Sequence, residues 1–200
     1  MNRSSALKIA ERLMSLLQPL CMRIDVAGSL RREKPEVGDI EIVCEPKKIS
    51  TPNGAQLLFE EYGTLANLVV TEDWKNTVRL LGKIIKGKPD GRMMQIELPE
   101  SIMLDLFMPR PEDYYRQLAI RTGSATFSHQ VIAAGWKRIG WCGTGDGLRK
   151  MSECLETKTP DKSTWKCCVA TPTLPPVWES EIDFFKWINV TFIEPKYREI

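Results

Sequence analysis

The sequence lacks the features that mark membrane, secreted and repeat proteins. No apolar stretch approaches the roughly 18 residues that a membrane-spanning helix requires. Residues 1–14, MNRSSALKIAERLM, carry a charge every few positions and so lack the apolar region of a secretory signal peptide. No internal repeat is found, which excludes solenoid and propeller architectures. We therefore expect a soluble, cytoplasmic chain with no membrane partner.

An excess of charge of one sign is also missing, because 28 lysine and arginine residues face 26 aspartate and glutamate residues. The net charge of +2 neither indicates nor opposes a nucleic-acid partner, so any contact with DNA must come from local basic clusters. With 42% hydrophobic and 27% charged residues, the 200-residue chain has the composition of a folded globular protein. Disordered, collagen-like and coiled-coil classes are excluded.

Cysteine occurs six times, but no two cysteines form the C-x-x-C pair that is typical of zinc sites. Adjacent cysteines, such as Cys167 and Cys168, rarely bind one tetrahedral ion. A disulfide framework is not expected in a chain of this size in a reducing compartment. We therefore expect free thiols at Cys21, Cys44, Cys142, Cys154, Cys167 and Cys168.

The spacing of apolar residues predicts both helices and strands along the chain. Apolar positions three and four apart predict helices over residues 4–21, 54–62, 111–120, 124–137 and 179–188. Alternating or continuous apolar stretches predict strands over residues 23–27, 39–44, 76–85, 93–98 and 102–108. We therefore expect an α+β fold in which a mixed sheet is flanked by helices.

A domain boundary is predicted at Pro109-Arg110-Pro111, where two prolines interrupt the pattern. Residues 1–110 would form the sheet-containing domain, and residues 111–200 a smaller domain that is mostly helical or of αβ type. A glycine-rich stretch that contains cysteine follows the helix expected over residues 124–137, and residues 171–176 are expected to form a loop.

Three carboxylates on the predicted strands suggest a cation site. Asp39 and Glu41 are two residues apart, so their side chains leave the same face of one strand. Asp105 is the only charge in the apolar stretch 102–108, where an unpaired buried carboxylate would be costly and where binding a cation would remove the cost. Three such carboxylates suit Mg²⁺ or Mn²⁺. The alternative is that Asp39 and Glu41 lie on a solvated strand face.

A glycine-serine turn precedes these carboxylates. Gly28 and Ser29 follow the strand 23–27, where free backbone N–H groups and a hydroxyl can bind phosphate oxygens. Arg31 and Arg32 come directly afterwards, and guanidinium groups bind phosphate strongly. Phosphate-binding groups beside cation-binding carboxylates are the combination that phosphoryl and nucleotidyl transfer require.

The motifs Gly28-Ser-Leu-Arg-Arg32, Gly38-Asp39-Ile40-Glu41 and Leu104-Asp105-Leu106 closely resemble the nucleotidyltransferase signature of the family X DNA polymerases. Arg121-Thr122-Gly123-Ser124, followed by Phe127, resembles the T-G-S segment of that family.

The end of the chain extends the resemblance. Glu181-Ile-Asp-Phe-Phe185, with Ile193-Glu194-Pro195 and Arg198, is similar to the closing helix and E-P-x-x-R tail of the family. The likeness covers nearly the whole chain, although residues 45–100 and 140–175 match only weakly.

This resemblance implies a palm domain over residues 1–110 and a thumb domain over residues 111–200, with no N-terminal lyase domain. It implies a template-directed DNA polymerase of the repair or gap-filling type, which adds nucleotides to a primer 3′-hydroxyl and releases pyrophosphate. The implied partners are a DNA primer-template or gapped DNA and a dNTP or NTP, bound by a monomer. The implied cofactor is a pair of Mg²⁺ ions, which Mn²⁺ would be able to replace.

The resemblance also implies roles for single residues. Asp39 and Glu41 would bind both ions, and Asp105 only the ion that activates the attacking hydroxyl. Ser29 and Arg32 would hold the β- and γ-phosphates, and Gly38 would let them approach the backbone. The residues implied to bind the nucleotide are Gly28, Ser29, Arg32, Gly38, Arg121, Thr122, Gly123 and Ser124.

Several positions depart from the family pattern: Met103 replaces the arginine two residues before the third carboxylate, and a thumb arginine expected near Ile132 is missing. Glu41 replaces an aspartate with a longer side chain that still binds Mg²⁺. Ile120-Arg121 replaces an aromatic pair that packs against the nucleotide sugar, so the resemblance does not predict discrimination against ribonucleotides.

Local basic residues are the candidates for DNA binding, since phosphate contacts need lysine and arginine. These are Lys83, Lys86, Lys88 and Arg92 in the first domain, with Lys137 and Arg138 after the helix expected in the second. The resemblance adds His129, which occupies the place of a DNA-facing thumb residue of the family. The alternative for each is a solvated surface position.

Two other functions remain open at this point. An untemplated nucleotidyltransferase would use the same chemistry on an RNA end, a protein hydroxyl or a small molecule. A DNA-end binding module with a degenerate site would use none of it. The T-G-S segment and the E-P-x-x-R tail favour the polymerase.

Overall fold

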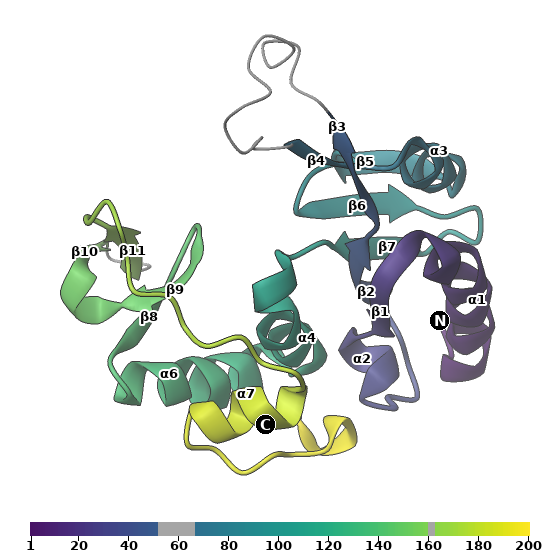
Figure 1. Ribbon diagram of the computed structural model, residues 1–200. Helices are drawn as coiled ribbons and strands as arrows, with labels where there is room; N and C mark the ends of the chain where they lie inside the picture. Colours follow the sequence, from purple (N-terminus) through teal and green to yellow (C-terminus); the bar gives the residue numbers. More distant parts are fainter. Residues whose placement is uncertain (52–66, 160–162) are drawn as a thin grey trace, which may run out of the picture. The chain divides into compact units, whose positions relative to one another are not determined.

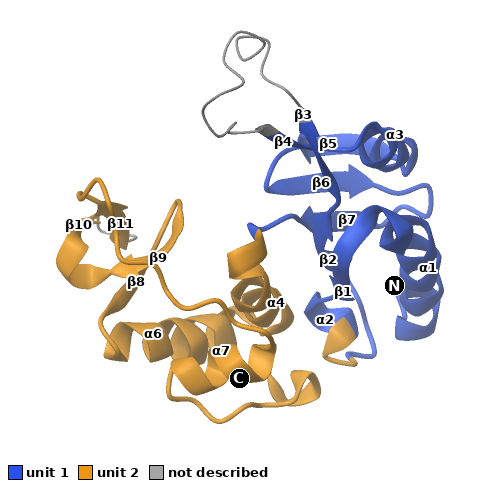
Figure 2. Ribbon diagram, viewed as in Figure 1, with its two compact units in different colours: residues 1–30, 34–110 blue, residues 31–33, 111–200 orange. Residues whose placement is uncertain are grey.

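The structure is a computed structural model that describes residues 1–51, 67–159 and 163–200 (Figure 1). The chain forms two compact units, of which the first comprises residues 1–30 and 34–110 and the second residues 31–33 and 111–200 (Figure 2). Both units combine helices with a mixed sheet, so the predicted α+β class is confirmed. No helix in the described ranges is long and apolar enough to cross a membrane.

The first unit begins with the expected amphipathic helix, α1 (Arg3–Leu17). Asn2 caps it, because its side chain accepts a hydrogen bond from the Ser5 N–H. The helix ends before Pro19, which lies in the 3₁₀ turn η1 (Gln18–Leu20), and strand β1 (Cys21–Val26) follows at once. The predicted helix over residues 4–21 is therefore confirmed but ends one turn early.

A five-stranded sheet forms the body of the first unit, in the order β1-β2-β7-β6-β5. Strands β2 (Asp39–Pro46) and β7 (Met103–Phe107) are parallel, whereas the pairs β1–β2, β7–β6 (Met93–Glu97) and β6–β5 (Lys83–Gly87) are antiparallel. Apolar side chains of α1 and α3 (Glu72–Leu80) pack with those of β2, β6 and β7 in one core. A separate antiparallel pair is made by β3 (Lys48–Thr51) and β4 (Asn67–Val70).

One predicted strand of this unit is wrong. Residues 76–85 do not form a strand: they contain the end of α3, a break at Gly82 and the start of β5. Thr71 caps α3 by accepting from the Trp74 N–H, and the buried Trp74 and Val78 lie one turn apart on the helix. The helix predicted over residues 54–62 lies outside the described residues.

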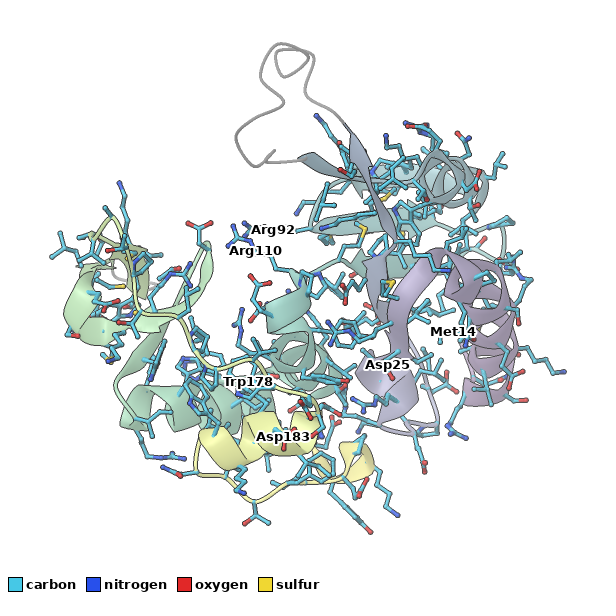
Figure 3. All side chains as sticks on the ribbon, viewed as in Figure 1. Met14, Asp25, Arg92, Arg110, Trp178 and Asp183 are labelled. Atoms are coloured by element: carbon cyan, nitrogen blue, oxygen red, sulfur yellow. The ribbon has the colours of Figure 1, made fainter. Side chains whose placement is uncertain are left out.

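Helices and an aromatic core characterise the second unit. The unit begins with the 3₁₀ turn η2 (Pro111–Asp113) and helix α4 (Tyr114–Thr122). Three helical segments then follow one another without a gap: α5 (Ala125–Phe127), the π-helix η3 (Ser128–Ala133) and α6 (Ala134–Arg138). Helix α7 (Glu181–Trp187) and the 3₁₀ turn η5 (Pro195–Tyr197) lie near the end of the chain. The core includes Trp178, labelled in Figure 3, whose ring meets Phe184 edge to face at 5.0 Å. The helices predicted over residues 111–120, 124–137 and 179–188 are therefore confirmed.

The second unit also holds a sheet, as the αβ alternative for this domain allowed, but none of its strands was predicted from the sequence. Strands β8 (Trp141–Thr144), β9 (Gly147–Lys150), β10 (Cys154–Lys158) and β11 (Ser163–Cys167) pair in the order β10-β11-β8-β9, with the 3₁₀ turn η4 (Met151–Glu153) between β9 and β10. Strand β10 is almost wholly exposed, so its sequence shows no alternation of apolar and polar residues. All six cysteines are free thiols.

Candidate active site

The three predicted carboxylates share one face of the first unit's sheet. Glu41 of β2 lies directly opposite Asp105 of β7 in the parallel register, and Asp39 is opposite Met103. Paired residues in neighbouring strands point to the same face, as do residues two apart in one strand. Asp39 and Glu41 are half-buried, and Ile40 between them is fully buried on the face that packs against α1 and α3. The prediction that Asp39 and Glu41 share a face is confirmed, and the register adds Asp105.

The sheet register also identifies residues that the sequence did not suggest. Gln95 and Glu97 of β6 lie opposite Asp105 and Met103 respectively, so both belong to the same face. We call this surface, with Asp39, Glu41, Gln95, Glu97 and Asp105, the carboxylate face. The alternation of Gln95 and Glu97 with apolar residues predicted a strand, but it did not mark these two polar residues as part of a site.

A hydrogen bond from Gln95 changes the interpretation of Asp105. The Gln95 Nε2 group donates to Asp105 Oδ1 at 2.9 Å, and Asp105 is half-buried rather than enclosed in the core. The expectation of a carboxylate without a partner in an apolar strand is therefore wrong, because the polar partner comes from the neighbouring strand. A cation is not needed to explain the presence of Asp105 there.

The glycine-serine turn lies against the Glu41 side chain. Gly28 begins the short helix α2 (Gly28–Arg31), where the sequence suggested a turn, with φ of +64°. A Cβ atom on Gly28 would lie 2.1 Å from Glu41 Oε2 and would force this carboxylate to move, and the positive φ itself favours glycine. Backbone pairing supports this contact, since the Ala27 N–H donates to the Glu41 carbonyl at 2.8 Å.

Ser29 supplies an unsatisfied polar atom beside this contact. Its hydroxyl oxygen is buried and has no hydrogen-bond partner among the described residues. A buried hydroxyl without a partner is destabilising and rare in native proteins, so it indicates a site that a ligand oxygen can complete. Gly38 is exposed, and a Cβ there would meet no atom within 4 Å, which leaves the backbone before Asp39 open to a ligand.

Arg32, the predicted phosphate ligand, is held by protein groups in the second unit. Its Nε donates to Glu199 Oε2 and its Nη1 to the Thr122 carbonyl, both at 2.7 Å. Glu199 is the accessible partner, since its side chain is 42% exposed whereas that of Arg32 is 12% exposed. A phosphate that binds Arg32 would therefore replace the Glu199 carboxylate.

Arg31 belongs to a buried ionic cluster of the second unit. Its Nη1 donates to Thr122 Oγ1 at 2.7 Å and its Nη2 to Glu181 Oε2 at 2.5 Å. The other Glu181 oxygen accepts from Arg198 Nη1 at 2.7 Å, and Arg198 is completely buried. Burial lowers the pKa of the Arg198 guanidinium, and the Glu181 carboxylate opposes this change. Glu181 therefore compensates the charge of a buried arginine, which would be costly without a partner.

The residues of the T-G-S segment make structural contacts. Ser124 caps α5 by accepting from the Phe127 N–H at 3.1 Å, and its own N–H donates to the Arg198 carbonyl at 3.0 Å. A Cβ on Gly123 would lie 2.6 Å from the Phe127 ring, so the glycine permits close packing. Thr122 is buried, and Arg121 lies half-buried in the last turn of α4. Nucleotide binding by these residues stays a prediction.

Four of the candidate DNA-binding residues lie on the hairpin between β5 and β6. Lys83, Lys86, Lys88 and Arg92 are all exposed, and β5 is an edge strand of the sheet. Arg110 is also exposed; it follows β7 close to Arg92, because the Met108 N–H donates to the Arg92 carbonyl at 2.8 Å (Figure 3). His129 is exposed on η3 in the second unit.

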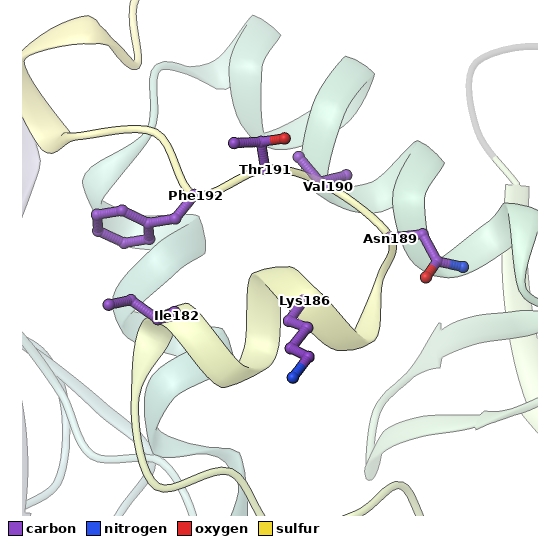
Figure 4. A pocket seen from close by; sticks show the side chains of 6 residues that line it. All are labelled: Ile182, Lys186, Asn189, Val190, Thr191 and Phe192. Carbon is purple, nitrogen blue, oxygen red and sulfur yellow. The ribbon is translucent and has the colours of Figure 1, made fainter.

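An open hollow of about 450 Å³ lies in the second unit, beside α7 (Figure 4). Its lining includes none of the predicted site residues and consists of Ile182, Lys186, Asn189, Val190, Thr191 and Phe192.

The carboxylate face has suitable chemistry for Mg²⁺ or Mn²⁺ but is not arranged as a finished site. Carboxylate oxygens are the ligands that both ions prefer. Among the residues that the structure describes, no group of three or more histidine, cysteine, aspartate or glutamate side chains is arranged to hold a metal ion. The Mg²⁺ pair therefore stays a prediction, supported by the register and by the donor type.

No protein-family model matches the chain, and no curated protein matches its sequence.

Proposed function

We propose that the protein is a nucleotidyltransferase that extends a DNA primer in a template-directed manner and fills short gaps. The observation that carries this proposal is the register that places Asp39, Glu41 and Asp105 on one face, with the Gly28-Ser29 turn packed against Glu41. The resemblance of these motifs to those of family X polymerases supports it. The first unit would then be the palm and the second the thumb.

In the reaction, the primer 3′-oxygen attacks the α-phosphorus of the nucleotide. The bond from that phosphorus to the bridging oxygen breaks, pyrophosphate leaves, and the hydroxyl proton passes to solvent. Asp39, Glu41 and Asp105 would hold two Mg²⁺ ions, which when bound lower the pKa of the hydroxyl and neutralise the triphosphate. The Ser29 hydroxyl, which is buried without a partner among the described residues, would donate to a phosphate oxygen.

The β5–β6 hairpin would bind the DNA backbone. Lys83, Lys86 and Lys88 are exposed and close together in sequence, so they can contact successive phosphates. Binding of this kind weakens as salt rises, because phosphate contacts release counterions.

Primer extension tests the proposal directly. The purified protein is incubated with Mg²⁺, a labelled primer on a one-nucleotide gap, and each dNTP and NTP separately. Addition of only the complementary nucleotide supports a templated polymerase, and the NTP lanes report sugar selectivity. Addition that ignores the template, or no addition to the DNA primer, refutes the polymerase and favours an untemplated transferase with another acceptor.

A matched pair of variants tests the site. Asp105→Asn should abolish incorporation and leave DNA binding unchanged, whereas Asp146→Asn in the exposed turn between β8 and β9 should change neither. Equal activity of the two variants would refute the assignment of Asp105.

A further inference from the structure

We propose that Gln95 is a positioning residue, which fixes the Asp105 carboxylate in the orientation that binds a divalent cation. The inference rests on the proposed function and adds a residue that the sequence motifs do not include. Gln95 would act through Asp105 and would not touch the reacting atoms.

The geometry of the strands supports this role. Gln95 and Asp105 are directly opposed on the antiparallel strands β6 and β7, so their side chains are neighbours on the carboxylate face. The 2.9 Å hydrogen bond from Gln95 Nε2 engages Asp105 Oδ1 and leaves Oδ2 available to a cation. Because Gln95 is half-buried on a strand, its position is set by the sheet.

The chemistry of the amide suits a cation-binding carboxylate. A glutamine donates a hydrogen bond without adding a positive charge, so the negative charge of Asp105 stays available to a cation. A partner in the second coordination shell that orients a carboxylate in this way is a common feature of metal sites, and its loss weakens metal binding.

A β-bulge places a lysine in the same row of side chains. The register shifts between Ile84 and Lys86, and this shift puts Lys86 opposite Gln95. Without the bulge, Lys86 would point to the other face, because alternate residues of a strand point in opposite directions. Gln95 therefore stands between Lys86 and Asp105, whose backbones are two strand spacings, about 10 Å, apart.

The test replaces the amide by an apolar group of similar size. In Gln95→Met, the affinity of the protein for Mn²⁺, measured by electron paramagnetic resonance without nucleotide or DNA, should fall about 10-fold. The Mg²⁺ concentration for half-maximal incorporation should rise, and kcat should fall while the KM for dNTP stays unchanged. In Gln95→Thr the side chain is too short to donate a hydrogen bond to Asp105, so this variant should show the same losses as Gln95→Met. It replaces Gln95→Met if that variant does not fold.

Gln117→Met is the matched control. Gln117 makes the same kind of bond in the second unit, from its Nε2 to Asp113 Oδ2 at 3.1 Å, so its loss measures the general effect of removing a glutamine–aspartate contact. The control should bind Mn²⁺ as the wild type does. Equal Mn²⁺ affinities of Gln95→Met and the wild type, or equal losses in both variants, would overturn the role of Gln95.

The two failures are distinguishable. If the wild type binds Mn²⁺ and incorporates dNTP, Asp105→Asn binds Mn²⁺ more weakly and loses incorporation, and Gln95→Met is unchanged in both, the proposed function stands and the role of Gln95 is refuted. If the wild type neither binds Mn²⁺ nor incorporates a nucleotide, the proposed function is refuted, and the role of Gln95 with it.

Discussion

Replacing Glu181 by glutamine should strongly destabilise the second unit, because it removes the charge that two arginines share. Arg198 is 0% exposed and Glu181 only 7%, so water cannot take over the lost interaction at Arg198. Arg31 keeps more access to solvent, with a side chain that is 23% exposed. Most of the cost therefore arises at Arg198.

The magnitude follows from the burial of the cluster. Removing one partner of a buried ion pair costs about 3–5 kcal/mol, because the remaining charge is left without compensation. Glutamine keeps the shape and one oxygen acceptor, and the Arg198 guanidinium still contacts the Phe185 ring at 4.8 Å and donates to the Ile193 carbonyl. We therefore expect the lower end, about 3 kcal/mol.

Urea unfolding followed by tryptophan fluorescence measures this cost. The signal reports mainly the second unit, which holds five of the six tryptophans: Trp136, Trp141, Trp165, Trp178 and Trp187. With a denaturant slope of about 1 kcal/mol/M for a unit of this size, the midpoint should fall by about 3 M, or the unit should be unfolded already without urea.

Glu199→Gln is the control, because it removes the same charge from an exposed pair. Glu199 is 42% exposed beside Arg32, so this variant should lose less than about 1 kcal/mol, and raised salt should reduce the loss further. The Glu181 loss should hardly change with salt. A loss in Glu181→Gln no larger than in the control would refute the argument that burial makes this charge essential.

Three further predictions concern a glycine, a thiol and a lysine. Gly28→Ala should destabilise the first unit by about 1–3 kcal/mol in urea unfolding, since φ at position 28 is positive. A second change, Glu41→Asp, should recover part of this loss by removing the steric overlap. A loss within experimental error in Gly28→Ala would contradict the prediction. Burial, followed by a hydrogen bond with Cys154, raises the pKa of Cys142 from its ordinary value near 9 to about 12. The thiol therefore loses its proton at lower pH in the unfolded chain than in the folded protein, and the free energy of unfolding should fall as pH rises from about 9 to about 12. This fall should be smaller in Cys142→Ala. Equal pH slopes of the wild type and this variant would refute the raised pKa. Lys86→Ala should weaken DNA binding and reduce the salt slope of log K by about 1, whereas Lys8→Ala on α1 should change neither.

The sequence predicted the elements whose pattern is set locally. The alternation in β2 predicted that Asp39 and Glu41 share a face, since burial of Ile40 and Ile42 requires it. The apolar pattern gave a wrong prediction where a helix and a strand follow each other closely. Apolar residues of α3 and β5 formed one apparent strand over residues 76–85, although Thr71 before Glu72 and Asp73 is a helix N-terminal signal.

Contacts between distant residues are the part of the site that the sequence could not supply. Glu199 is 167 positions from Arg32, and no spacing rule links them. The partner of Asp105 depends on the register between β6 and β7, and a shift of one residue would turn Gln95 to the other face. The motifs therefore predicted correctly that the carboxylates are neighbours, but they did not predict the protein groups that contact Arg32 and Asp105.

The pairing of Gly28 with Glu41 shows why two motifs separated along the chain act as one unit. The Glu41 side chain reaches the turn so closely that any side chain at position 28 would overlap its carboxylate. The positive φ of Gly28 turns the chain into α2, and the hydroxyl of the next residue, Ser29, is buried without a partner among the described residues. A Cβ at position 28 would force the Glu41 carboxylate to move, and the positive φ there would strain any residue other than glycine. The glycine-serine turn and the strand that carries Glu41 are therefore joined by a close contact that their spacing along the chain does not show.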